Sequence, residues 1–289
     1  MAQRHATILP LTLRGPEEGA FSAAGLTEVH TWRDLSGQVC ARGYTGATGR
    51  WMQWPGIVAF HFDDSGRIDA YPEAGVDAAF VTDLCRRSVE PIVRQALGWE
   101  TLHASAVRRG GAVVAFCGER ETGKSTLAYS LARRGYHQQS DDAVVMQVAG
   151  EGVRVLDLPF GVRLRPEAAA FYGFEPRPRQ VLHDVEPLAP LSAGPVATLP
   201  LRVIFSLARK PEGAVSIERL SSAAAFTALL AQAHCFDPQH AEGKRRLLQN
   251  YLAIADLVPV FRLTFSAGLD RLHLVLEVIE QAVQEVAAA

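Results

Sequence analysis

The sequence predicts an α/β protein with a mixed sheet, and two patterns carry this prediction. Ala112–Cys117 is a short apolar run typical of a buried strand, and it is followed by a glycine-containing loop and a helical pattern at Ser125–Arg134. The β-type runs 143–148 and 153–156 are separated only by Ala149–Gly152, as in a hairpin. A hairpin is antiparallel, so a sheet that contains it beside a strand-loop-helix unit is expected to be mixed.

A small β-rich segment ending in a helix precedes this domain. Ile57–Phe62 and Arg67–Tyr71 flank a turn-forming stretch and predict a hairpin. Residues Thr82–Leu97 have apolar positions at helical spacing, Gly98 is expected to stop that helix, and Pro91 is expected to kink or delay it.

The C-terminal third returns to regular elements after an irregular stretch. Pro166–Pro200 is rich in Pro and Ala and predicts an extended, loop-like excursion. The elements expected beyond it are strands at 201–206 and 260–265 and helices at 221–233, 242–257 and 269–286. We therefore divide the chain into a β-rich segment at 1–100 and an α/β domain at 101–289.

Composition excludes several classes of protein. The 289 residues are 48% hydrophobic and 21% charged, which is ordinary for a soluble globular protein. A net charge of −2 provides no electrostatic basis for binding nucleic acid or an anionic membrane. Four scattered cysteines form neither a zinc pattern nor a disulfide framework. No signal-type N-terminus or long apolar run occurs, so we expect a cytoplasmic protein, and a homo-oligomer is left open.

The loop after Ala112–Cys117 carries the clearest chemical motif. Its residues match the phosphate-binding pattern G-x-x-x-x-G-K-[ST] and are Gly118, Glu119, Arg120, Glu121, Thr122, Gly123, Lys124, Ser125 and Thr126. Backbone N–H groups and a helix N-terminus attract a triphosphate, Lys124 would reach its β- and γ-phosphates, and Ser125 would place its hydroxyl on Mg²⁺. The alternative is a simple strand-to-helix turn with a solvated lysine, and the flanking strand and helix argue against it.

Glu121 makes this loop unusual. It stands where many such loops have a third glycine, and a positive φ would cost Glu more than Gly. Its carboxylate also adds negative charge near the expected phosphates. We expect Arg120 to neutralise part of that charge, so that nucleotide binding is weakened rather than abolished.

Two adjacent acids, Asp141 and Asp142, stand at the start of the predicted strand 143–148. Phosphoryl transfer depends on positioning and charge neutralisation, so one carboxylate would help to hold Mg²⁺ and the other would accept the proton of the attacking hydroxyl. An ordinary turn or cap is the alternative. A hairpin turn at Arg108–Gly111 is expected to join the loop strand to the strand before it, and His103 is expected to start that earlier strand. By itself His103 is interpreted as a packed or surface histidine.

As an ordered set these residues carry a family resemblance. Leu102-His103-Ala-Ser-Ala-Val, the loop Gly118–Thr126, Leu131-Ala-Arg-Arg-Gly135 and Ser140-Asp141-Asp142 resemble the catalytic domain of HPr kinase/phosphorylase and its shorter relatives. The resemblance is strong over residues 100–170 and looser toward the C-terminus. It implies a P-loop kinase fold related to phosphoenolpyruvate carboxykinase, with a mixed sheet.

The resemblance also implies residue roles. It implies Lys124 on the phosphates, Ser125 on Mg²⁺, one of Asp141 and Asp142 as base with the other near the metal, and His103 supporting the pair. We assign Asp141 as base and Asp142 as metal ligand, with the reverse assignment left open. In a segment similar to one near the site of the shorter relatives, Arg163 is a candidate phosphate or substrate contact, with a surface arginine as the alternative.

Other candidate clusters have simpler interpretations. Trp32, Trp51 and Trp54 suggest a ligand-stacking surface, but core packing of a small domain is the preferred interpretation. Lys244-Arg245-Arg246 suggests a phosphate cluster, but a solvated helix face is preferred.

The expected function is an ATP- and Mg²⁺-dependent kinase that acts on a hydroxyl, preferably a serine of a peptide or small protein. The chain lacks the N-terminal domain and the phosphorolysis signature of full-length HPr kinases, so the sugar-transport phosphocarrier is not the expected substrate. A kinase of a small molecule and a non-catalytic nucleotide sensor are the alternatives.

Overall fold

The chain divides into two compact units, which are described separately. The computed structural model describes residues 9–15, 21–34, 36–158, 161–175, 183–184 and 198–288. The small unit comprises the described residues up to Thr101 together with His234–Leu248, and the large unit comprises Leu102–Ala233 and the chain from Gln249 onward. The sequence predicted one boundary, after residue 100. The small unit in the structure also contains His234–Leu248, a segment from the C-terminal third of the chain.

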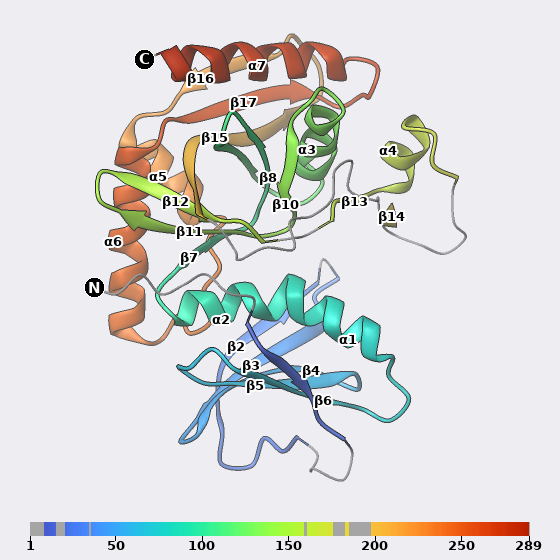
Figure 1. The fold of residues 1–289 in the computed structure, drawn as a ribbon, viewed down its shortest axis with the longest axis vertical. Coiled ribbons are helices and arrows are strands. Elements are labelled where there is room, and N and C mark those ends of the chain that lie inside the picture. The colour runs from blue at the N-terminus through green and yellow to red at the C-terminus, as the bar shows by residue number, and fades with distance from the viewer. Residues whose placement is uncertain are drawn as a thin grey trace. The chain divides into compact units, whose positions relative to one another are not determined.

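The large unit is built on a mixed sheet (Figure 1). Its strands are β8 (Ala104–Arg109), β9 (Ala112–Cys117), β10 (His137–Ser140), β11 (Val144–Ala149), β12 (Gly152–Leu156), β15 (Thr198–Lys210), β16 (Ser216–Arg219) and β17 (Val260–Ser266). They lie in the order β10-β8-β9-β15-β12-β11, and β17 pairs with both β15 and β16. The pairs β9·β15 and β15·β17 are parallel and β8·β9, β10·β8 and β11·β12 are antiparallel, which confirms the predicted mixed sheet.

Helices and short strands complete this unit. They are α3 (Lys124–Ala132), β13 (Arg163–Leu164), α4 (Pro166–Phe171), β14 (His183–Asp184), α5 (Ser222–Leu230) and α7 (Leu272–Ala288). The chain passes between the units within β7 (Glu100–Leu102), between Ala233 and His234, and within α6 (Ala241–Leu257).

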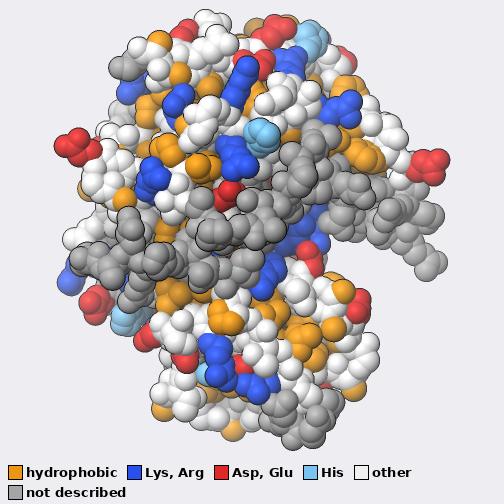
Figure 2. All heavy atoms as spheres, viewed as in Figure 1, with side chains coloured by type: hydrophobic (Ala, Val, Ile, Leu, Met, Phe, Trp, Pro, Cys, Tyr) orange, Lys and Arg blue, Asp and Glu red, His pale blue; other side chains and the backbone are white. Residues whose placement is uncertain are grey.

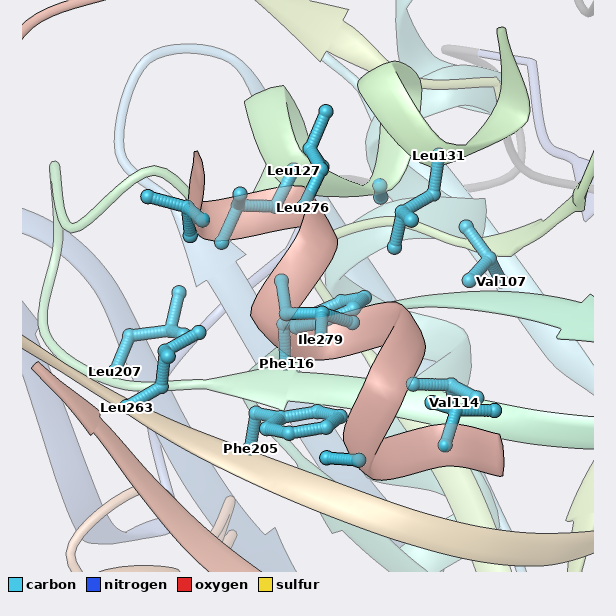
Figure 3. Close-up of a cluster of buried hydrophobic side chains, with 14 of the residues drawn as sticks. Val107, Val114, Phe116, Leu127, Leu131, Phe205, Leu207, Leu263, Leu276 and Ile279 are labelled. Carbon is cyan, nitrogen blue, oxygen red and sulfur yellow. The ribbon is translucent and has the colours of Figure 1, made fainter. Parts of the chain in front are cut away.

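The core of the large unit lies between one face of its sheet and the helices α3 and α7. Phe116 of β9 and Phe205 of β15 stack with ring centroids 5.6 Å apart, and Ile279 of α7 is fully buried in the same cluster. Figure 3 shows these side chains beside Leu127 and Leu131 of α3. Because α3 follows the loop directly, this packing fixes the helix N-terminus against the sheet.

The small unit consists of a six-stranded sheet covered on one face by a helical segment. Its strands are β1 (Leu11–Leu13), β2 (Thr27–Arg33), β3 (Val39–Gly46), β4 (Gly49–Trp54), β5 (Val58–Phe62) and β6 (Ile68–Pro72), in the order β1-β6-β5-β4-β3-β2. The helical segment is α1 (Ala78–Leu84), a π-type turn at Cys85–Val89 and α2 (Glu90–Ala96). Phe60 and Phe62 of β5 are fully buried in a cluster with Val89 and Ile92.

Most predicted elements are present with shifted bounds. The hairpins β5·β6, β8·β9 and β11·β12 are confirmed. Gly110 and Gly111 both have positive φ, as a tight turn between β8 and β9 requires. Gly98 and Gly135 end their helices with φ of 95° and 90°.

A π-type turn at Cys85–Val89 interrupts the regular helix directly before α2, whose first turn contains Pro91, the residue expected to kink or delay this helix. Two other local predictions need correction. Pro166–Phe171, expected as loop, forms α4 because proline suits the first helical position. The strand expected at 201–206 extends over all of β15. Residues 176–182 and 185–197 of the expected excursion lie outside the described residues.

Aromatic and cationic candidates of the small unit have structural contacts. Trp32 and Trp54 pack against the core cluster, as preferred for the tryptophans, whereas Trp51 lies against Phe21, His61 and Tyr71 outside that cluster. In the cationic cluster on α6, Lys244 and Arg245 are exposed, as a solvated helix face requires, whereas Arg246 is partly buried and donates to the backbone oxygen of Gln95 at 3.0 Å.

The surface and the cysteines agree with the composition. Acidic and basic side chains are interspersed on the face in view in Figure 2. Cys40, Cys85, Cys117 and Cys235 are all free thiols. In the part of the chain that the structure describes, no helix combines the length and the apolar character needed to cross a membrane.

A buried charge network holds the helical segment of the small unit. Glu90 is 1% exposed and accepts hydrogen bonds from Arg94 Nη2 at 2.5 Å and Arg86 Nη1 at 2.8 Å. Removing one partner of a buried pair leaves the other charge desolvated, which is costly, whereas an exposed pair contributes little.

We expect Glu90→Ala to lower the free energy of unfolding of the small unit by about 3 kcal/mol, because it removes the buried carboxylate that accepts hydrogen bonds from Arg94 and Arg86. Urea unfolding followed by tryptophan fluorescence measures this, since Trp32, Trp51, Trp54 and Trp99 all lie in the small unit. Asp64→Ala, which breaks the exposed Arg50–Asp64 pair, is the control and should shift stability by less than about 0.5 kcal/mol. Equal effects of the two variants would contradict the prediction.

Candidate functional site

Strand direction brings the predicted site segments to one edge of the large unit's sheet. Both β9 and β10 are antiparallel to β8, so they run in the same direction and their carboxyl ends lie at the same edge. The loop Gly118–Gly123 follows β9, Asp141 and Asp142 follow β10, and His103 precedes β8 at that edge. The topology therefore places these residues together although up to 39 positions separate them in the sequence.

Two glycines of the loop have positive φ angles that residues with a side chain rarely adopt. Gly118 has φ 145°, and a Cβ there would lie 2.8 Å from the carbonyl oxygen of Leu207. Gly123, the N-cap of α3, has φ 100°. Glu121 has φ 67°, which is the left-handed conformation expected from the sequence to be unfavourable for a glutamate at this position. The loop thus adopts a tight, partly strained turn directly before the helix.

Lys124 folds back over this turn. Its Nζ donates hydrogen bonds to the carbonyl oxygens of Gly118 at 2.9 Å and Glu119 at 3.0 Å. Burial lowers the pKa of Lys124, while Asp142 and other nearby acidic groups oppose that shift. The ammonium therefore lies against the backbone at the start of the turn.

Backbone donors at the start of α3 are available to a ligand. Among the described residues, none accepts a hydrogen bond from the backbone N–H groups of Gly123, Lys124, Ser125 or Thr126. These are the donors that an α-helix leaves unpaired at its start, and they carry the positive end of the helix dipole. The turn therefore offers a lysine and several free N–H donors to an anion.

Asp141 is the most connected side chain of the site. It is 1% exposed, and its Oδ1 accepts hydrogen bonds from Ser105 Oγ at 2.5 Å and Ser125 Oγ at 2.8 Å. Its Oδ2 accepts the backbone N–H of Arg163 at 2.9 Å. Burial, followed by the neighbouring charge of Asp142, raises the pKa of Asp141 to about 6. A carboxylate with a raised pKa beside the loop serine is suited to accept a proton.

Asp142 and His103 lie next to this carboxylate. Asp142 has φ 67°, and its backbone oxygen accepts a hydrogen bond from His103 Nδ1 at 3.0 Å. This bond places the imidazole proton on Nδ1 and leaves Nε2 as an acceptor. Burial and then the charge of Lys124 lower the pKa of His103, so the ring is neutral at neutral pH.

The remaining loop residues have structural contacts. Thr122 Oγ1 donates to the carbonyl of Glu119 at 2.8 Å, which closes the turn. Gln232 donates to the Glu119 carboxylate at 3.4 Å. The cation that pairs with Glu121 is Arg165, at 2.6 Å, and not the neighbouring Arg120. Arg163 donates its backbone N–H to Asp141, and the side chain of Arg165, two positions further along, reaches the loop at Glu121.

Two residues of the site escaped the sequence patterns. Ser105 lies within β8 and read as an ordinary strand residue. Arg209 lies near the end of β15, beyond the strand that its apolar pattern predicted, and donates from Nε to the Thr122 carbonyl at 3.0 Å. The only signal for Arg209 was that it starts a pair of charged residues, Arg209-Lys210, directly after the apolar part of the strand.

Arg209 also contacts β17. Its Nη1 donates to the Ser266 carbonyl at 3.0 Å, and its guanidinium lies 4.4 Å from the centre of the Phe265 ring. Burial lowers the pKa of Arg209. The side chain therefore links the loop to β17 and holds the Thr122 carbonyl on one side of the turn.

The described residues contain no group of three or more His, Cys, Asp or Glu side chains able to hold a metal ion by themselves. Ser125, Asp141 and Asp142 are nevertheless oxygen donors, the kind that Mg²⁺ prefers. Mg²⁺ is commonly bound by one or two side chains together with substrate phosphates, and this donor set fits that mode.

We expect Arg209→Met to weaken nucleotide binding by about tenfold, because a lost charge-assisted hydrogen bond frees the Thr122 carbonyl and loosens the turn. Arg209→Lys should recover only part of the loss, since an ammonium cannot make both the loop bond and the Ser266 bond with the same geometry. Titration calorimetry with ATP measures both. An unchanged ATP affinity of Arg209→Met would contradict the expectation that the Arg209 side chain stabilises the turn.

We expect Asp141→Asn to unfold at a higher temperature than the parent at about pH 7.5. Folding raises the Asp141 pKa from 3.8 to about 6, so this group stabilises the fold only while protonated. That contribution is present below 3.8 and is lost as the pH rises through about 6. A neutral amide, which can accept from the Arg163 N–H and donate to the two serines, avoids this loss of at most about 3 kcal/mol.

Thermal unfolding at several pH values checks the Asp141 prediction. The two proteins should converge toward about pH 4, where the parent carboxyl is itself mostly protonated in the fold. A parent that is more stable than Asp141→Asn at both pH values would contradict it.

Comparisons with known proteins identify no family for the chain. No protein-family model matches the sequence, and no curated protein matches it. Among solved structures, the HPr(Ser) kinase/phosphatase from Coxiella burnetii aligns over 64% of this chain and 97% of its own, with 12% identity and a TM-score of 0.33. This likeness is distant, and no activity is transferred from it to the present chain.

Proposed function

We propose that this chain is an ATP- and Mg²⁺-dependent kinase that transfers the γ-phosphate to a hydroxyl, with a serine of a peptide or small protein as the acceptor. The observation that supports it is the hydrogen bond between Asp141 and Ser125, the serine that follows Lys124 in the loop. It joins a phosphate-binding motif to a buried carboxylate with a raised pKa, the two parts that phosphoryl transfer to a hydroxyl needs.

Triphosphate binding fits the loop. The free N–H groups at the start of α3 point to an anion site, and Gly118 lies too close to the Leu207 carbonyl for any side chain to be accommodated. Lys124 has two neutral carbonyl partners, which it would exchange for charged phosphate oxygens. Since hydrogen bonds between charged groups are stronger than those to neutral oxygens, this exchange favours the bound state.

Magnesium fits the oxygen donors beside the loop. Ser125 would turn its hydroxyl from Asp141 to the cation, and Asp142 would supply a carboxylate. Mg²⁺ supplies charge neutralisation of the phosphates when bound. The assignment of Asp142 rather than Asp141 to the metal is part of the proposal, and it leaves Asp141 free to act as base.

Asp141 carries the proton transfer in this mechanism. It accepts the proton of the acceptor hydroxyl while that oxygen bonds to the γ-phosphorus and the bond to the β-phosphate oxygen breaks. Lys124 and the N–H groups of α3 stabilise the charge on the departing diphosphate. His103 donates a hydrogen bond from Nδ1 to the Asp142 backbone oxygen and so positions the acidic pair.

A serine acceptor is proposed from the resemblance of residues 100–170 to the shorter relatives of HPr kinase, which are found beside peptide-modification gene sets. A small-molecule acceptor would use the same loop chemistry, and the transfer measurement below distinguishes the two acceptors.

The test separates binding from transfer. Lys124→Ala should remove ATP binding, while Asp141→Asn should keep ATP binding within a few-fold and reduce transfer by about a hundredfold or more, because it loses only the general base. ATP affinity is measured by calorimetry. Transfer is measured by mass spectrometry of serine-containing peptides encoded beside the gene, incubated with labelled ATP.

Arg134→Gln is the matched control for folding, because Arg134 pairs with Glu280 in the same unit and takes no part in the site. A reversed pattern, in which Lys124→Ala transfers phosphate and Asp141→Asn loses ATP, would refute the assigned roles. ATP binding without transfer to any peptide or small hydroxyl compound would instead support a nucleotide sensor.

A further inference from the structure

Glu121 and Arg165 form an ion pair at the mouth of the loop, and the inference drawn from it rests on the function proposed above. Arg165 Nη2 lies 2.6 Å from Glu121 Oε1. Glu121 belongs to the phosphate-binding turn, so the pair puts an acid and a base where the proposed function puts phosphate. An anion at that place repels the carboxylate and attracts the guanidinium.

The backbone that carries Arg165 is firmly anchored. Val162 and Leu164 are 1% and 0% exposed and pack against Tyr129 of α3. Because side chains alternate along an extended segment, Arg163 and Arg165 lie on the opposite side from these two apolar residues. The Arg163 N–H bonds to Asp141, so the segment that carries Arg165 is also tied to the proposed base.

The position of Glu121 is equally determined. Its φ of 67° is unfavourable for a residue with a side chain and persists only where surrounding contacts impose it. The next residue, Thr122, is held from both sides, through its carbonyl by Arg209 and through its hydroxyl by Glu119. Glu121 therefore presents its carboxylate toward Arg165 as a fixed feature of the turn.

The pair is exposed enough to exchange partners. The side chains of Arg165 and Glu121 are 53% and 51% exposed. Exposed ion pairs contribute little to stability, so opening this one costs little. Arginine binds phosphate oxygens in a two-pronged fashion, and phosphate carries more charge than a carboxylate.

We propose that Arg165 is a phosphate-binding residue for the terminal phosphate of a nucleoside triphosphate, and that Glu121 holds its guanidinium in place while no nucleotide is bound. On binding, Arg165 exchanges the carboxylate for the terminal phosphate oxygens. Glu121 thus acts as a built-in competitor of the nucleotide, and the loop trades affinity for an arginine that is already in position. The pair also explains the glutamate where such a turn would favour glycine.

The test compares ATP and ADP affinity in the presence of Mg²⁺ for four proteins: the parent, Glu121→Gln, Arg165→Gln and the double variant. Arg165→Gln should weaken ATP by about tenfold and ADP by much less, because ADP lacks the terminal phosphate. Glu121→Gln should bind ATP several-fold more tightly. In the double variant this gain should disappear, since there is no arginine left to release.

The double-mutant cycle distinguishes competition from simple repulsion. If Glu121 only repels phosphate, Glu121→Gln gains the same factor with and without Arg165, and the proposal is overturned. It is also overturned if Arg165→Gln leaves ATP affinity unchanged or weakens ATP and ADP equally. Arg134→Gln, which breaks another arginine–glutamate pair of the same unit, should change neither affinity.

Failure of the inference and failure of the proposed function give different results. A parent protein that binds neither nucleotide overturns both. A parent that binds ATP and transfers phosphate, with Arg165→Gln indistinguishable from it, overturns the inference alone. Thermal unfolding of each variant verifies folding, and Arg165→Lys, which retains the charge, should recover part of the ATP affinity.

Discussion

The buried carboxylate of Asp141 is the point on which the geometry of the site depends. It accepts hydrogen bonds from Ser105 in β8, from Ser125 in α3 and from the backbone of Arg163 in β13. Three segments that are distant in sequence are thus held by one side chain that follows β10. Removing such a group from water is unfavourable unless it is hydrogen-bonded, which explains why every neighbouring segment contributes a donor.

Burial of the Asp141 carboxylate is thermodynamically unfavourable at neutral pH. Its pKa is raised because burial and the Asp142 charge disfavour the ionised form. Among the described residues, Glu121 and Asp142 are the two that are not glycine and have positive φ, and both belong to the site. Positive φ and unfavourable charge are therefore concentrated in the loop and the acidic pair, while β9, the strand that leads into the loop, is apolar throughout.

Local signals predicted the elements well where they were strong. The apolar run of β9, the paired glycines between β8 and β9 and the glycine after α3 each have one physical interpretation, and each was confirmed. The sequence patterns failed where tertiary contacts determine the secondary structure. β10 is a run of polar residues with no β-type pattern, and it becomes a strand because β8 offers it a partner along its edge. His234–Leu248 joins the small unit, which no local signal in that segment indicates.

The sequence by itself determined the loop, its lysine and serine, the two acids after it and the mixed character of the sheet, because each depends on neighbours within a few positions. Only the tertiary structure decided which acid is buried, that Ser105 and Arg209 belong to the site, and that Arg165 rather than Arg120 pairs with Glu121. These contacts join residues up to 87 positions apart. Strand direction and side-chain burial bring them together, and neither property can be read from the residues adjacent to any one of them.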